Sequence, residues 1–178
     1  MRVRAVVLAA AVGAVFAAVG AQEAVRAQEN VTFATLPARD YFEIKQLYAR
    51  YVQGLDSGAD GGNAFANVFT PSGVLMDEHG TLTQGHAELA ALARATGKGP
   101  THVAHFETNL LIVPAPGGAT GRSYVVSVGP GPGGQPILTN DGQFQDELVK
   151  TPAGWRFSKR EYHAAPLERP ATGAPSAR

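Results

Sequence analysis

The 178-residue chain contains no cysteine. A disulfide, a thiol nucleophile and a cysteine-ligated metal centre are therefore excluded, even if the protein works in an oxidising compartment. The chain also has no excess of charge, with 15 Lys and Arg residues against 15 Asp and Glu residues and no basic run. Because no overall field favours a nucleic acid or an anionic membrane surface, we expect neither as a partner. Stability must come from packing.

The first residues have the features of a targeting signal. Arg2 and Arg4 precede an uncharged run of small apolar residues that extends to Ala21, and small residues at Ala21 and Ala27 offer cleavage points. We predict a signal peptide with its cleavage region over residues 1–27, and export to the periplasm or beyond. The alternative is an uncleaved anchor, because the run is barely long enough to cross a bilayer. After signal removal we expect no stable membrane insertion.

The sequence predicts a long first helix that begins near Pro37. The fixed φ of proline suits a first helical turn, and apolar residues recur after it at helical spacing. They form one stripe: Ile44, Leu47, Tyr48, Tyr51 and Leu55. Ser57 and Gly58 end the pattern, so the helix should stop there with its apolar stripe in the core.

The remaining elements are shorter and turn from helices to strands. Helical patterns near residues 65–69 and 86–95 flank a short hairpin at 74–84. Four strands punctuated by Gly and Pro follow, at 101–113, 121–128, 137–149 and 154–162. This order predicts an α+β domain, with helices packed on one face of a curved antiparallel sheet. We place the domain at residues 28–163 and a disordered tail at 164–178.

Several short motifs follow one another along residues 37–163. They are Tyr51-Val-Gln-Gly-Leu-Asp56, Val68-Phe-Thr-Pro-Ser-Gly73, Gly85-His86, His105-Phe-Glu-Thr-Asn109, Gly142-Gln-Phe-Gln-Asp146, and Gly154-Trp155-Arg156-Phe157 with Arg160. In order and spacing they resemble the SnoaL-like domains of the nuclear transport factor 2-like superfamily. The resemblance implies a cone-like barrel with a one-ended hydrophobic pocket. It implies no single activity, because the superfamily includes scytalone dehydratase, bile-acid dehydratase, ketosteroid isomerase and polyketide cyclases.

Three residues are the candidate catalytic groups: His105, Asp56 and Tyr51. His105 resembles the histidine that dehydratase-like members place on the first long strand, and an imidazole can take and return a proton near neutral pH. Tyr51 and Asp56 resemble a tyrosine and an aspartate five residues apart in those members. A phenol can hold a substrate oxygen, and a carboxylate can orient an imidazole.

Each of these residues also has a structural alternative. Tyr51 could be a core aromatic residue, Asp56 a turn residue, and His105 a histidine bonded within the sheet. Five residues along a helix correspond to about 140°. Asp56 can therefore share a pocket with Tyr51 only if the helix ends there or the pocket wraps around it.

The candidate substrate-binding residues follow from alternation along a strand. If His105 faces a cavity, its face of the strand also carries Val103, Glu107, Asn109 and Leu111. Asn109 could then donate a hydrogen bond to a substrate oxygen, while Glu107 would need a partner or a place near the rim. Phe144 stands where many relatives carry an aromatic residue, but it offers no hydroxyl.

Neither a metal nor a cofactor is expected. His102 and His105 are three residues apart on a predicted strand, so their imidazoles would point to opposite faces. We interpret Trp155 as a core anchor and Asp146 as the partner of an arginine on the adjacent strand. For Arg160, a contact with an anionic group of the substrate is the alternative to a structural role.

The leading functional hypothesis is a cofactor-independent acid–base lyase. It would act on a small hydrophobic, oxygenated aromatic or alicyclic substrate, by eliminating water or by a retro-aldol-like loss of a small fragment. The alternative is a non-catalytic exported binding protein for a small hydrophobic molecule, or a dimerisation module. A contact between His105 and Asp56 would favour catalysis. The third hypothesis is a ketosteroid-type isomerase or a polyketide cyclase, and the resemblance also implies a homodimer through the open sheet face.

Overall fold

A computed structural model of the chain describes residues 35–97 and 103–165. The predicted signal peptide, His102 and the predicted tail beyond residue 165 lie outside these ranges. Within the described ranges, no helix is both long enough and apolar enough to cross a membrane.

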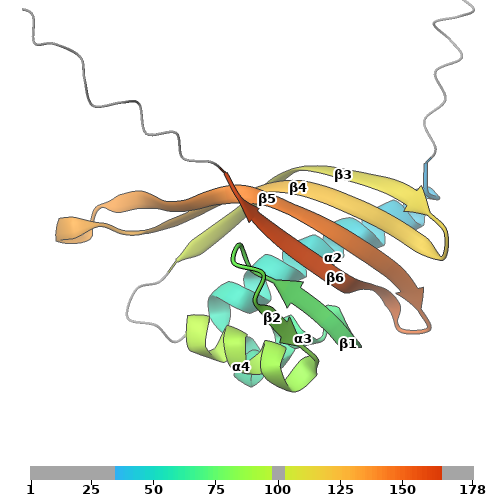
Figure 1. The fold of residues 1–178 in the computed structure, drawn as a ribbon, viewed down its shortest axis with the longest axis horizontal. Helices are drawn as coiled ribbons and strands as arrows, with labels where there is room; N and C mark the ends of the chain where they lie inside the picture. The colour runs from blue at the N-terminus through green and yellow to red at the C-terminus, as the bar shows by residue number, and fades with distance from the viewer. Residues whose placement is uncertain (1–34, 98–102, 166–178) are drawn as a thin grey trace, which may run out of the picture. The chain divides into compact units, whose positions relative to one another are not determined.

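The described part of the chain folds as three α-helices packed on a six-stranded sheet (Figure 1). The helices are α2 (Ala38–Ser57), α3 (Asn63–Ala66) and α4 (His86–Gly97), with short 3₁₀ turns η1 (Ala59–Gly62) and η2 (Pro132–Gly134). The strands are β1 (Phe69–Met76), β2 (Leu82–Gln84), β3 (Ala104–Ala115), β4 (Gly118–Pro130), β5 (Pro136–Thr151) and β6 (Gly154–Ala164). Their order in the sheet is β2-β1-β6-β5-β4-β3.

The sheet is mixed rather than wholly antiparallel. Strands β3 to β6 pair in succession as antiparallel hairpins, as the sequence predicts. Strand β1 instead pairs in parallel with β6, for example Leu75 with Arg160. The sequence pattern of β1 does not predict this pairing, because β1 and β6 are far apart in the sequence although they are neighbours in the sheet. The predicted α+β class with helices on a curved sheet is confirmed, with one parallel pair and a sheet that stays open.

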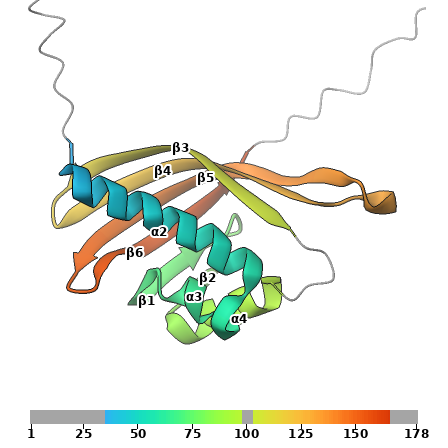
Figure 2. The same ribbon diagram turned by 180° about the vertical axis from the view of Figure 1, so that it is seen from behind.

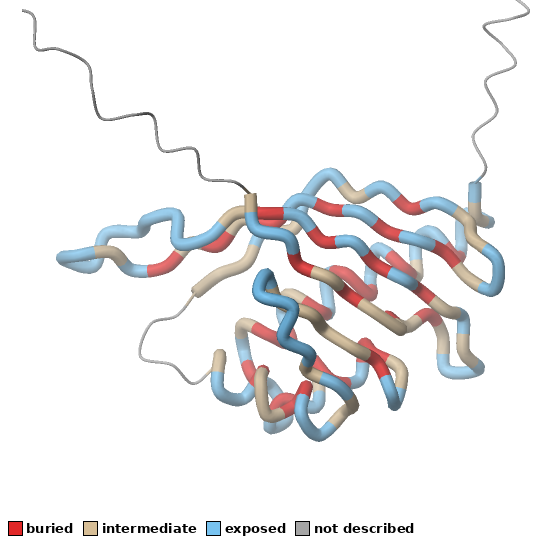
Figure 3. The backbone as a smooth tube through the Cα atoms, in the orientation of Figure 1, coloured by how far each residue is buried: buried red, intermediate tan, exposed pale blue. Residues whose placement is uncertain are grey.

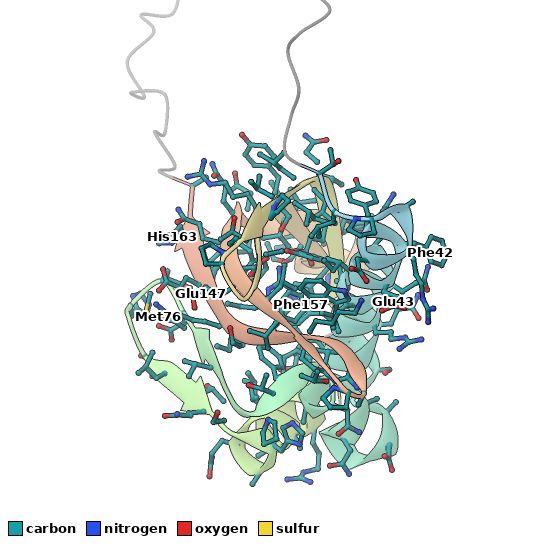
Figure 4. The ribbon with its side chains drawn as sticks, turned by 90° about the vertical axis from the view of Figure 1, so that its right-hand side faces the viewer. Phe42, Glu43, Met76, Glu147, Phe157 and His163 are labelled. Atoms are coloured by element: carbon teal, nitrogen blue, oxygen red, sulfur yellow. The ribbon has the colours of Figure 1, made fainter. Side chains whose placement is uncertain are left out.

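Helix α2 lies across one face of the sheet (Figure 2). The predicted stripe is buried, with Ile44 fully covered and Leu47, Tyr48, Tyr51 and Leu55 nearly so. Burial alternates along β4, and along β5 from Gly142 onward, so one face of each strand there meets the helix and the other meets solvent (Figure 3). Phe157 lies among the side chains packed between α2 and the sheet, whereas Phe42 lies on the exposed side of α2 (Figure 4). The sheet face under α2 is therefore where a site can form.

Candidate active site

Asp56 and His105 form a hydrogen-bonded pair between the end of α2 and the start of β3. One carboxylate oxygen, Oδ1, lies 2.5 Å from the ring Nδ1 of His105, and the other accepts the backbone N–H of His105 at 3.0 Å. The two contacts fix both the position and the rotation of the imidazole. Because Nδ1–H donates to Asp56, Nε2 is the nitrogen with a free lone pair.

The C-terminal end of α2 makes this pair possible. Gly58 takes a left-handed conformation, with φ of 56°, and its N–H bonds to the carbonyl of Gly54, which ends the helix directly after Asp56 and Ser57. A glycine adopts this conformation without the penalty that a Cβ would bring. The helix therefore ends where the sequence-based reasoning requires, and Asp56 reaches β3 although Tyr51 points elsewhere on the helix.

Tyr51 and His105 line one cavity, as expected. The cavity has a volume of about 160 Å³. Its apolar walls include Leu55, Val125 and Phe144, and Asp56 lies behind His105 rather than on the cavity surface. The imidazole is thus presented to the cavity, while its carboxylate partner holds it from outside. The side chains of His105 and Asp56 are 21% and 18% exposed, so neither points freely into solvent.

Tyr51 is held by aromatic side chains around its ring. The ring is 3% exposed and packs against those of Phe65 and Phe144, with centroids 5.0 and 5.7 Å away. Burial raises the pKa of its hydroxyl above the ordinary tyrosine value, although the nearby Arg160 opposes this. The phenol therefore stays protonated near neutral pH and can donate a hydrogen bond into the cavity.

Asn109 and Leu111 do not share the face of His105, which corrects the sequence-based expectation. The pairing of β3 with β4 breaks between Thr108 and Leu111, and Asn109 has a φ of 52°. Two residues of β3 face one residue of β4 at this bulge, which reverses the alternation beyond it. Leu111 is consequently 57% exposed, and both residues lie at a separate surface hollow beside Tyr124.

Val103 is also absent from the cavity lining among the described residues. It precedes the first residue of β3, Ala104, and its side chain lies close to Gly129 on β4. Phe144, the fourth predicted substrate-binding residue, does line the cavity. The aromatic position therefore lies at the site, whereas the positions predicted from strand alternation do not.

Arg160 is not among the described residues that line the cavity. It is fully buried, and its Nε donates to Asp146 at 2.8 Å, while its Nη1 and Nη2 contact Glu107. The guanidinium carbon lies 4.0 Å from the ring centroids of both Tyr51 and Phe144. This arrangement corrects the alternative reading of Arg160 as an anion receptor. It also shows that Asp146 pairs with an arginine on the adjacent strand and that Glu107 has a buried partner.

The structure adds polar cavity residues that the sequence reasoning missed. Ser127, Asn140 and Tyr162 line the cavity, and the Tyr162 hydroxyl lies 2.7 Å from Oδ1 of Asn140. Ser127 belongs to the buried face of β4, but that face mixes Ala, Gly, Ser and Val, so the sequence shows no apolar alternation there. Asn140 carries no signal either, because it is exposed overall and reaches the cavity beside a register shift. In the described residues, no group of three His, Asp or Glu side chains is arranged to hold a metal ion.

An open, curved sheet on a long helix, with an apolar cavity at the helix end, defines a nuclear transport factor 2-like α+β fold. Residues 37–161 match the model of the SnoaL-like domain family, and the chain belongs to this family. The resemblance in the sequence motifs is thereby confirmed. The superfamily includes dehydratases and isomerases.

Solved structures support the same fold. A protein of unknown function from Mycobacterium tuberculosis is similar with a TM-score of 0.65 and 28% identity, covering 75% of this chain and 76% of that chain. A nuclear transport factor 2-like protein with a cystatin-like fold from Novosphingobium aromaticivorans is similar with a TM-score of 0.63 and 27% identity, covering 75% of this chain and 85% of that chain. A scytalone dehydratase-like protein from the same organism is similar with a TM-score of 0.60 and 19% identity, covering 70% of this chain and 83% of that chain. This likeness shows the fold alone. No curated protein matches the chain.

Proposed function

We propose that the protein is a cofactor-independent acid–base lyase that eliminates water, or a small carbonyl fragment, from a small hydrophobic oxygenated molecule. The observation that carries the proposal is the Asp56–His105 pair, with His105 on the wall of an apolar cavity that Tyr51 also lines. A positioned imidazole backed by a carboxylate is suited to moving a proton to and from a bound substrate.

The proposed step begins with the neutral imidazole. Nε2 of His105 takes a proton from a substrate carbon, the electrons of that C–H bond form a C=C bond, and the neighbouring C–O bond breaks. The proton then returns from the imidazolium to the departing oxygen, which leaves as water. Asp56 stabilises the imidazolium that forms transiently and keeps Nε2 directed toward the cavity.

Tyr51 supplies the hydrogen bond that holds a substrate oxygen. Its hydroxyl stays protonated near neutral pH, because burial raises its pKa. A donor in a site with little water stabilises negative charge as it develops, more than the same donor would in bulk water. In a retro-aldol-like loss, His105 would take the proton of a substrate hydroxyl, a C=O bond would form there as the neighbouring C–C bond breaks, and the imidazolium would return the proton to the enolate carbon that carries the electron pair away.

The test combines a substrate screen with three substitutions. Hydrophobic aromatic and alicyclic hydroxy compounds that raise the melting temperature are incubated with the protein, and loss of water is followed by mass spectrometry. His105→Gln and Asp56→Asn should each lower kcat by about a hundredfold or more, and the double variant little further, because the pair acts as a unit. Tyr51→Phe should cost less if the phenol only positions the oxygen.

The matched control is His163→Gln, since His163 is exposed and does not line the cavity. Its kcat should equal that of the unmodified protein, and all variants should keep their melting temperature within a few degrees. Full activity in His105→Gln would end the lyase proposal. Binding without turnover of any compound would favour the exported binding protein instead.

We also propose that the chain is exported and forms a homodimer through the outer face of the sheet. Export is supported by the basic start and apolar run of the first residues. Dimerisation is supported by large apolar side chains on that face, where Phe106, Leu111 and Tyr124 are each more than half exposed. Gathered apolar side chains of this kind are typical of protein interfaces.

A further inference from the structure

The cavity is small for a binding site. Its volume is about 160 Å³, and an apolar protein cavity of about 150 Å³ is known to hold benzene. Apolar side chains, including Leu55, Leu75 and Val125, form much of its wall. One six-membered ring therefore fills a cavity of this volume, and any larger ligand must extend through its open side.

Two residues with carboxylate side chains, Asp77 and Glu78, line the cavity directly after β1. Asp77 accepts the backbone N–H groups of Thr81 and His79, at 2.8 and 2.9 Å. These hydrogen bonds, that of Thr81 foremost, hold the pKa of Asp77 below its ordinary value, so the group is ionised at neutral pH. Glu78 follows it, with a side chain that is 40% exposed. Both residues line the cavity, and therefore place negative charge beside any ligand that enters.

Positive charge is held away from the ligand. No lysine or arginine occurs among the described residues that line the cavity. The guanidinium of Arg160 lies behind the rings of Tyr51 and Phe144, where its hydrogen bonds go to Asp146 and Glu107. An anionic ligand would thus meet two carboxylates and find no lysine or arginine in the described wall, where His105 already pairs with Asp56.

We infer that the site selects uncharged ligands, placing one six-membered ring in the cavity and rejecting anions through Asp77 and Glu78. This inference rests on the proposed function in that it assigns the substrate to the same cavity. It does not need turnover, because the selection acts on binding. The ligand class is a monocyclic alcohol, ketone or amide, or a larger molecule that inserts one uncharged ring.

The test compares benzamide with benzoate, which have nearly the same shape and differ in charge. Dissociation constants are measured by NMR titration of the purified protein. Benzamide should bind about tenfold more tightly than benzoate, as expected for two carboxylates acting near a partly exposed site. In the double variant Asp77→Asn/Glu78→Gln, benzoate should bind about tenfold more tightly than before, while benzamide affinity stays the same. Asparagine can preserve the turn that Asp77 makes.

Two further variants control for net charge and for location. Asp60→Asn/Glu88→Gln changes the net charge equally at exposed residues outside the cavity lining, and should leave both affinities unchanged. Leu75→Phe adds bulk to the cavity wall and should abolish benzamide binding, with the melting temperature confirming that the variant folds.

The inference is overturned if benzoate binds as tightly as benzamide, if Leu75→Phe leaves benzamide binding intact, or if benzamide does not bind at all. These results are separate from the fate of the proposed lyase activity. Failure to find turnover would leave the dissociation constants unchanged. Loss of turnover in His105→Gln would likewise not alter the difference in affinity between benzamide and benzoate.

Discussion

Replacing Arg160 with methionine should remove a large part of the free energy of unfolding of the domain. The guanidinium is fully buried and is the cation that the described structure places between Asp146 and Glu107. Methionine would keep most of the apolar length while leaving two carboxylates without their positive partner. Removing one member of a buried charged pair typically costs about 3–5 kcal/mol, a large share of the roughly 5–15 kcal/mol that stabilises a domain.

The loss should depend on pH, with a definite sign. Burial raises the pKa of Asp146 above the ordinary aspartate value, and the charge of Arg160 opposes this effect. Without Arg160, the pKa in the folded state should rise further, so the folded protein keeps a proton that the unfolded chain releases. Stability is then greatest at low pH and falls as pH rises through the raised pKa. Arg160→Met should lose more stability at about pH 8 than at about pH 5.

The measurement is urea unfolding followed by the fluorescence of Trp155, which is the single tryptophan of the chain and is buried. The control is Glu107→Gln, which keeps an oxygen to accept bonds from Arg160 and Ser123 and leaves one cation paired with one anion. It should cost about 1 kcal/mol. An Arg160→Met variant as stable as this control, or one whose deficit does not change with pH, would refute the electrostatic reasoning.

Three other predictions concern the surface and the ends of the chain. Asn109→Ala should cost about 1–2 kcal/mol because of the left-handed backbone, Asn109→Gly should cost less, and neither should change kcat, as chemical unfolding and turnover assays would show. Leu111→Lys should convert a dimer into a monomer by light scattering, whereas a monomeric unmodified protein would contradict the interface proposal. Mass spectrometry of protein from its native cell should find an N-terminus at or after Gln22, and intact Met1 in a soluble cytoplasmic fraction would contradict export.

Much of the fold could be predicted because its signals are local. The stripe from Ile44 to Leu55 has helical spacing, and Gly58 follows it, so the extent and buried face of α2 were readable without any long-range information. The hairpins β3 to β6 were similarly marked by turns. The pairing of Asp146 with Arg160 could be anticipated from two opposite charges on adjacent strands, and the two residues are indeed directly opposite in the register.

The errors arose where one residue changes the phase of a strand. Strict alternation assigns His105, Asn109 and Leu111 to one face, but the bulge at Asn109 divides the strand. Asparagine tolerates the left-handed conformation better than most residues, which is compatible with a bulge but does not specify one. The parallel pairing of β1 with β6 was missed for a related reason, because a contact between distant strands leaves no periodic trace in either.

The candidate site and the core share one wall, and this links the stability of the domain to its proposed chemistry. Tyr51 presents one edge to the cavity, while the guanidinium of Arg160 lies 4.0 Å from the centre of its ring. Any change that frees Arg160 from Asp146 would therefore also weaken one of the contacts that hold the phenol in place. His105 is held differently, through both oxygens of Asp56, at the point where α2 ends. The two proposed functional groups are thus held by different contacts, so a change at Arg160 should affect Tyr51 before it disturbs the His105–Asp56 pair.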